Sequence, residues 1–154
     1  MFNEVNFFVA GIPKPQARPK VFHRTLKSGK GFTTTYSPKT NWYSLVYIKT
    51  LETKNSLKKR LCGALQVVLQ FYMPTPKSLS KKKIEKIYYV DKRPDVDNLA
   101  KAVMDAINQV GIWEDDSQVA DLRIIKAYSK NRFCVEGQPE GCKITIREIN
   151  QEEY

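Results

Sequence analysis

Apolar residues recur along this chain with two spacings, and the spacing separates expected strands from expected helices. VNFFVA at 5–10 and ALQVVLQFYM at 64–73 are short β-prone apolar runs, each closed by a nearby proline. In 40–59 and 98–110 the apolar residues recur every three or four positions, which predicts two helices with one apolar side. The other expected elements are a hairpin from 21–25 and 32–36, a short helix over 81–87, and strands over 117–129 and 143–149.

This order of elements predicts a single mixed α/β domain over residues 1–154, an α+β sheet covered by helices. A chain of 154 residues is long enough for one hydrophobic core. No apolar stretch could span a bilayer and the first residues do not resemble a signal peptide, so we expect a cytoplasmic protein. The cysteines Cys62, Cys134 and Cys142 are widely spaced without paired histidines, which predicts free thiols rather than disulfides or zinc ligands.

The charge balance indicates the kind of partner. The chain has 26 Lys and Arg against 16 Asp and Glu, a formal charge of +10. A basic surface attracts polyanions and gains free energy when it releases their counterions. Nucleic acid is therefore the expected partner. A membrane surface is not, because no basic amphipathic helix or lipidation signal is evident.

One acidic stretch carries the candidate chemistry. Pro94 favours an extended backbone before it, and in an extended chain Asp95 and Asp97 project to the same side. Asp97 is also expected to cap a helix that begins at Asn98. On that helix Lys101, Asp105 and Asn108 fall on the stripe opposite the apolar residues.

Carboxylates gathered in this way repel one another unless a cation lies between them. A hard divalent cation such as Mg²⁺ prefers oxygen ligands, polarises a phosphodiester and activates water, while Lys101 could stabilise charge on the phosphate. A structural alternative exists: Asp-x-Asp pairs are common in loops, Asp97 could be only a cap, and Lys101 and Asp105 could be a solvated face. The spacing alone supports both interpretations equally.

The longer motif resembles a known family. Pro94-Asp-x-Asp-Asn-Leu-x-Lys101, with Asp105, Trp113 and Asp115-Asp-Ser-Gln-Val119, is similar to the signature of RusA-type crossover junction endonucleases, the Holliday junction resolvases. The likeness extends through Gly11-Ile-Pro, Ala17-Arg-Pro-Lys20 and Tyr36-Ser-Pro-Lys39 to Lys126 and the last strand. It implies a small α/β homodimer, encoded by a bacterium or phage, that cuts four-way DNA with Mg²⁺ or Mn²⁺. It further implies that Asp95, Asp97 and Asp116 hold the metal as catalytic acids and that Lys101 is an essential basic partner.

Basic and aromatic residues near this motif are candidates for DNA contacts. Surrounding cations are needed because a cluster of carboxylates repels phosphates, although any single lysine could be only a solvated surface residue. Five aromatic residues could stack on unpaired bases, but core packing is expected for most of them; they are Phe22, Phe32, Tyr36, Tyr88 and Tyr89. The expected DNA contacts are Arg18, Lys20, Arg24, Lys92 and Arg93, with Lys126 added by the resemblance.

These observations lead to one functional hypothesis and two alternatives. The hypothesis is a Mg²⁺-dependent junction resolvase of recombination and repair that makes paired symmetric nicks near the branch point, with no nucleotide cofactor and no membrane partner. The first alternative is a DNA-binding protein that keeps the fold without catalysis, although such a protein gains nothing from acids beside phosphates. The second is a nuclease selective for flaps, forks or RNA hybrids.

Overall fold

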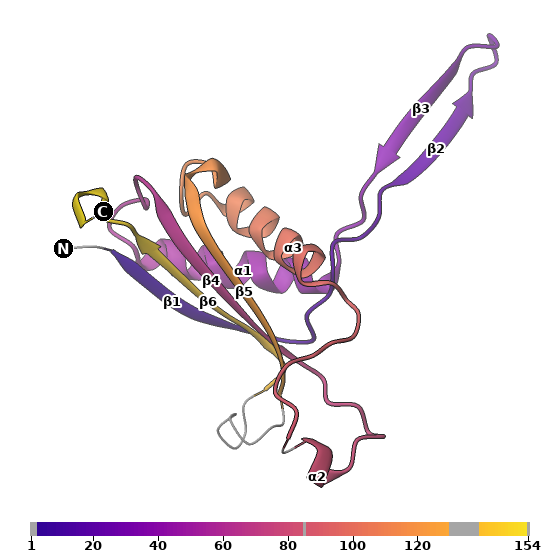
Figure 1. Cartoon of the computed structure of the whole chain (residues 1–154). Coiled ribbons are helices and arrows are strands. Elements are labelled where there is room, and N and C mark those ends of the chain that lie inside the picture. The colour runs from indigo at the N-terminus through magenta and orange to yellow at the C-terminus, as the bar shows by residue number, and fades with distance from the viewer. Residues whose placement is uncertain (1–2, 85, 130–138, 154) are drawn as a thin grey trace.

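The computed structural model describes residues 3–84, 86–129 and 139–153. Figure 1 shows a sheet covered by helices and a two-stranded arm that projects from this body. The sheet has the order β1-β6-β4-β5, and the arm pairs β2 with β3. The strands are β1 (Glu4–Ala10), β2 (Lys20–Thr25), β3 (Gly31–Tyr36), β4 (Leu65–Met73), β5 (Val119–Tyr128) and β6 (Gly141–Glu148). The helices are α1 (Asn41–Ser56), α2 (Lys81–Ile84) and α3 (Val96–Val110), with short 3-10 turns η1 (Asp116–Gln118) and η2 (Gln151–Glu153).

The mixed α+β fold predicted from the sequence is confirmed. β4 lies in the middle of the sheet, parallel to β5 and antiparallel to β6, while β1 runs antiparallel to β6 on the other side. Along β4 every second residue is fully buried, from Leu65 to Met73. Because successive strand residues point to opposite faces, this alternation places one face of the sheet on the core. Helices α1 and α3 cover that face (Figure 1).

Local sequence fixes where the two long helices begin and end. The Thr40 hydroxyl caps α1 by accepting a hydrogen bond from the backbone N–H of Tyr43 at 3.2 Å. α3 ends at Gly111, whose φ of 74° is a left-handed conformation that glycine adopts without strain. The chain then turns back into the core, and the indole of the buried Trp113 donates a 2.9 Å hydrogen bond to Asn108 on α3. This hydrogen bond ties the segment after α3 to the helix.

Two other expectations concern membranes and thiols. Among the described residues, no helix is long and apolar enough to cross a membrane. Cys62 is exposed and Cys142 is buried, both with free thiols, and burial raises the pKa of the Cys142 thiol. Cys134 lies outside the described residues.

Candidate functional site

Asp95 and Asp97 lie at the N-terminus of α3, but not in the conformation expected from the sequence. The helix begins at Val96, so Asp95 is the residue before it, with extended φ and ψ of −71° and 145°, and Asp97 is in the first helical turn. The predicted cap at Asp97 is therefore wrong, and the two acids do not share one extended strand. Both side chains are exposed, and neither has a hydrogen bond or an ion pair to any residue that the structure describes.

A groove of about 850 Å³ opens beside Asp95. Its walls come from the segment after β1, the ends of β4 and β5, and the approach to α3. Four cations line it, and the predicted Arg18, Lys92 and Arg93 are among them. The sequence analysis missed the fourth cation, Lys14, although the charge of the 13–40 segment pointed to this region. Side chains of this charge attract a phosphate backbone, which brings the backbone to the carboxylate of Asp95.

Lys126, the DNA contact that the resemblance implied, is largely buried on β5. Its residue is only 8% exposed, and its ammonium donates hydrogen bonds to the carbonyl of Lys92 and, at 2.7 Å, to the carbonyl of Pro94. The ammonium is therefore hydrogen-bonded to two backbone carbonyls of the segment that lines the groove, and a contact of Lys126 with DNA stays a prediction. Lys126 fixes the segment that leads into Asp95 against β5.

Lys126→Met is expected to lower the cleavage rate by roughly tenfold to a hundredfold with little loss of junction affinity, because small displacements of reacting groups are costly. The variant should also lose about 1–3 kcal/mol of stability, since it removes two hydrogen bonds that a charged group donates. Single-turnover kinetics, binding titration and thermal melting measure the three quantities. Lys143→Met, at an exposed lysine of β6, is the control and should change none of them. An equal loss of affinity and rate in Lys126→Met would identify Lys126 as a DNA contact.

Asp116 lies at the other end of α3. The helix separates it from Asp95 and Asp97, and its 15 residues span about 22 Å. β5 confirms the separation, because it starts at Val119 beside Asp116 and reaches Pro94 only with Lys126. Consistently, no group of three or more His, Cys, Asp or Glu within the described ranges is placed to hold a metal ion. Within one chain, Asp95 and Asp97 thus both lie at the start of α3, whereas Asp116 lies beyond its other end.

The turn that carries Asp116 is held by hydrogen bonds from the neighbouring residues, Asp115 among them. The Asp115 carboxylate accepts the N–H of Ser117 at 3.2 Å, and the Gln118 side chain accepts the N–H groups of Glu114 and Asp115. Hydrogen bonds from the side chain and then the backbone of Ser117 hold the pKa of Asp115 below its usual value. Gln118 also donates to the carbonyl of Gly63 at 3.0 Å. Asp115 is therefore used in the turn, whereas the carboxylate of Asp116, also exposed, has no hydrogen bond or ion pair to any residue that the structure describes.

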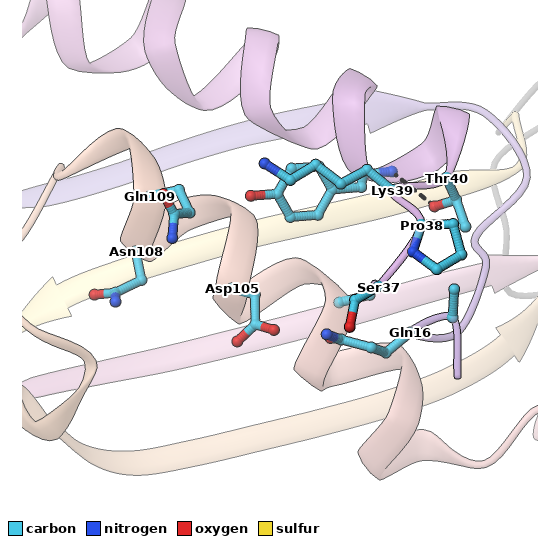
Figure 2. A pocket seen from close by; sticks show the side chains of 11 residues that line it. Gln16, Ser37, Pro38, Lys39, Thr40, Asp105, Asn108 and Gln109 are labelled. Carbon is cyan, nitrogen blue, oxygen red and sulfur yellow. Dashed lines mark hydrogen bonds between the residues drawn. The ribbon is translucent and has the colours of Figure 1, made fainter. Parts of the chain in front are cut away.

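The polar stripe of α3 does not face one site. Asp105 lines a second hollow of about 310 Å³, between α3, the start of α1 and the two segments that connect the arm to the body. Figure 2 shows Asp105 across this hollow from Gln16 and Ser37. The backbone N–H of Gln16 donates to the carbonyl of Asn98 at 3.2 Å, which ties the base of the arm to the first turn of α3. Lys101 is exposed and lines neither hollow.

The arm carries the remaining candidate residues. Lys20 and Arg24 are exposed on β2 and are not among the residues that line the groove. Core packing is wrong for most of the aromatic candidates: exposed fractions are 49% for Phe22, 44% for Phe32, 57% for Tyr36 and 68% for Tyr89. Tyr88 alone among them is half-buried.

An unpaired carboxylate, that of Asp95, in a groove lined by cations is an arrangement suited to an enzyme that acts on a phosphodiester backbone. Residues 10–136 match the family described as Endodeoxyribonuclease RusA. The uncharacterized protein YqaN of Bacillus subtilis is 34% identical over 132 residues, which cover 82% of this chain and 89% of that protein. The crossover junction endodeoxyribonuclease RusA of Escherichia coli K12 is 51% identical over 35 residues, 23% of this chain and 29% of that protein. The RusA protein of Enterobacteria phage 82 has the same identity over the same length. The chain belongs to the RusA endodeoxyribonuclease family.

Proposed function

We propose that this protein is a metal-dependent endonuclease that resolves four-way DNA junctions by paired nicks near the branch point. The observation that carries the proposal is the unpartnered carboxylate of Asp95 in a groove lined by four cations, with the exposed Asp97 two residues further along the chain. The relatives named RusA are crossover junction endodeoxyribonucleases, which supports the choice of substrate.

The donor set fits a hard divalent cation. Asp95, Asp97 and Asp116 offer only carboxylate oxygens, and no cation of the described chain is paired with them. Mg²⁺ and Mn²⁺ prefer such oxygen ligands, and Asp95, Asp97 and Asp116 would hold the ion. When bound, the ion would polarise the phosphodiester and lower the pKa of the attacking water.

A homodimer resolves the separation of Asp116 from the other two acids. β5 is the last strand of the described sheet; residues 88–90 bridge its end at Ala127, while Leu122 in its first half is 42% exposed. If the β5 strands of two protomers met antiparallel about a two-fold axis, the start of one strand would lie beside the end of the other. Asp116 of one protomer would then approach the segment that leads into the partner subunit's Asp95. We infer two equal centres, each completed by both chains.

The remaining residues have defined roles in this scheme. Arg18, Lys92 and Arg93 bind the phosphate backbone along the groove and set its register. Lys101 lies one helical turn after Asp97, so its ammonium can stabilise the charge that develops on the phosphate. Two centres related by a two-fold axis match the approximate symmetry of a four-way junction, which needs cuts in two strands of like polarity.

The direct test uses a labelled synthetic four-way junction and, for comparison, flap and fork substrates. With Mg²⁺ or Mn²⁺ the protein should cut two opposite strands of the junction near its centre, and in excess EDTA it should cut none. Mg²⁺ should also raise the melting temperature of the wild-type protein, because an ion that binds the folded state stabilises that state. The melting temperature of Asp97→Asn should not rise, because this variant lacks one of the proposed metal ligands. Undiminished cleavage in EDTA would contradict the proposed requirement for a metal ion. Faster cleavage of flaps or forks than of the junction would contradict the proposal that four-way junctions are the preferred substrate.

A further inference from the structure

The arm is the part of the fold that the proposed chemistry does not use. Both of its six-residue strands are exposed at every position, and Figure 1 shows them extending away from the sheet and helices. A hairpin that buries nothing against its own chain is marginally stable alone, so its exposed apolar residues indicate a partner. Besides the aromatic residues, the exposed apolar side chains are Val21 on β2 and Leu26 at the tip.

The strand register sorts the arm into two different faces. Directly opposed residues share a face, and the pairs are Lys20 with Tyr36, Phe22 with Thr34, and Arg24 with Phe32. This first face, which we call the aromatic face, combines three aromatic rings with two cations. The other face pairs Val21 with Thr35, His23 with Thr33 and Thr25 with Gly31, and the His23 ring is hydrogen-bonded to the Thr33 hydroxyl at 3.0 Å. All three rings therefore lie on one side of the ribbon.

Charge decides what this face contacts. Residues 13–40 contain seven Lys and Arg and no Asp or Glu. Two such arms from neighbouring copies would repel each other, whereas a polyanion would be attracted. Cations beside aromatic rings fit a ligand that offers phosphates and flat apolar surfaces, which is nucleic acid with accessible base faces. In continuous duplex the base faces are covered by their neighbours, but at a branch point they can open.

We propose that the aromatic face stacks on bases opened at the centre of the branched DNA, while Lys20 and Arg24 bind the adjoining phosphates. This inference rests on the proposed junction substrate. It adds the means by which the protein would distinguish a junction from continuous duplex DNA. The rings alternate between the strands in the order Tyr36, Phe22, Phe32, with steps of two residues, about 6.8 Å, along the ribbon. This step is twice the roughly 3.4 Å rise of stacked bases, so each ring can meet a different base. Because the base of the arm is hydrogen-bonded to α3 through Gln16, a bound branch is positioned relative to Asp95.

The test compares two double variants on opposite faces of the arm. Phe22→Ala/Phe32→Ala removes two rings from the aromatic face, and Val21→Ala/Thr35→Ala truncates a cross-strand pair on the other face. None of these side chains is part of the core, so both variants should fold. Affinity is measured in EDTA for a four-way junction and for a linear duplex of equal length. A 2-aminopurine base at the branch point reports stacking by its fluorescence.

The aromatic-face variant should lose roughly tenfold or more in junction affinity, keep its duplex affinity, and lose the fluorescence change that wild type produces at the branch. The control variant should match wild type in all three. Arg24→Gln should weaken junction and duplex binding alike and reduce the log-log salt slope by about one.

Three results would overturn the inference. The aromatic-face variant could bind the junction as wild type does, or lose junction and duplex affinity equally. It could also sediment as a monomer where wild type is a dimer, which would make a second copy of the chain the partner of the arm. Failure of the proposed function is distinguishable, since the wild-type protein itself would then show no preference for the junction over the duplex.

Discussion

Asp97→Asn is expected to abolish cleavage of a four-way junction while the folded protein still binds it. Asparagine keeps the size of the side chain but removes the charge that a divalent cation requires. An active-site metal ion stabilises transition-state charge by several kcal/mol, so the cleavage rate should fall by roughly a thousandfold or more. Affinity should persist or rise slightly, because it comes from the groove cations and the arm, and one phosphate-repelling charge has been removed. Single-turnover cleavage and gel-shift titration of the same preparation measure both quantities.

Asp115→Asn is the matched control for this loss. It removes a carboxylate from the neighbouring acidic turn, but the Asp115 side chain is used to cap η1, and asparagine caps as well as aspartate. The control should therefore cut junctions at nearly the wild-type rate. The account is wrong if Asp97→Asn cuts as fast as this control. It is equally wrong if Asp97→Asn loses junction binding while its melting curve stays cooperative.

The sequence predicted the elements because hydrophobic periodicity follows directly from burial. The alternation along β4 and the one-sided stripe of α3 are both present in the structure. The start of α3 was misplaced by two residues, since Asp95 and Asp97 are equally good capping residues and only the backbone shows which of them precedes the helix. The sheet order was not predicted, because strand patterns do not state which strands are neighbours.

The sequence identified the acidic residues, but it did not predict how they are arranged in space. The resemblance grouped Asp116 with Asp95 and Asp97 as metal ligands, whereas helix α3 keeps Asp116 apart from them within one chain. Lys126 was assigned to the surface because an isolated lysine on a strand is normally exposed, and nothing local reveals the two carbonyls that pair with it. The aromatic residues of the arm were expected in the core for a similar reason. A β-prone run has the same pattern whether or not another element covers it.

Trans-complementation is the second large effect expected, and it follows from the position of Asp116. The Asp97→Asn and Asp116→Asn homodimers should each be inactive, because every centre lacks one acid. In a heterodimer with one chain of each kind, the number of intact centres depends on whether each centre is shared between the chains or lies within one chain. If each centre combines Asp97 of one protomer with Asp116 of the other, one centre carries both substitutions and the other is intact. If each centre lies within one chain, both centres are damaged.

The activity of this heterodimer is therefore the most direct test of a metal centre shared between two chains. The two variants carry different affinity tags and are coexpressed, and the doubly tagged dimer is purified and incubated with Mg²⁺ and a supercoiled plasmid that extrudes a cruciform. A heterodimer of wild type and Asp97→Asn also holds one intact centre and sets the reference rate. We predict that the complementing heterodimer nicks the plasmid at roughly half the wild-type rate, matches the reference and yields nicked circles without linear product. A complementing heterodimer as inactive as its two parent homodimers, beside an active reference, would contradict the shared metal centre.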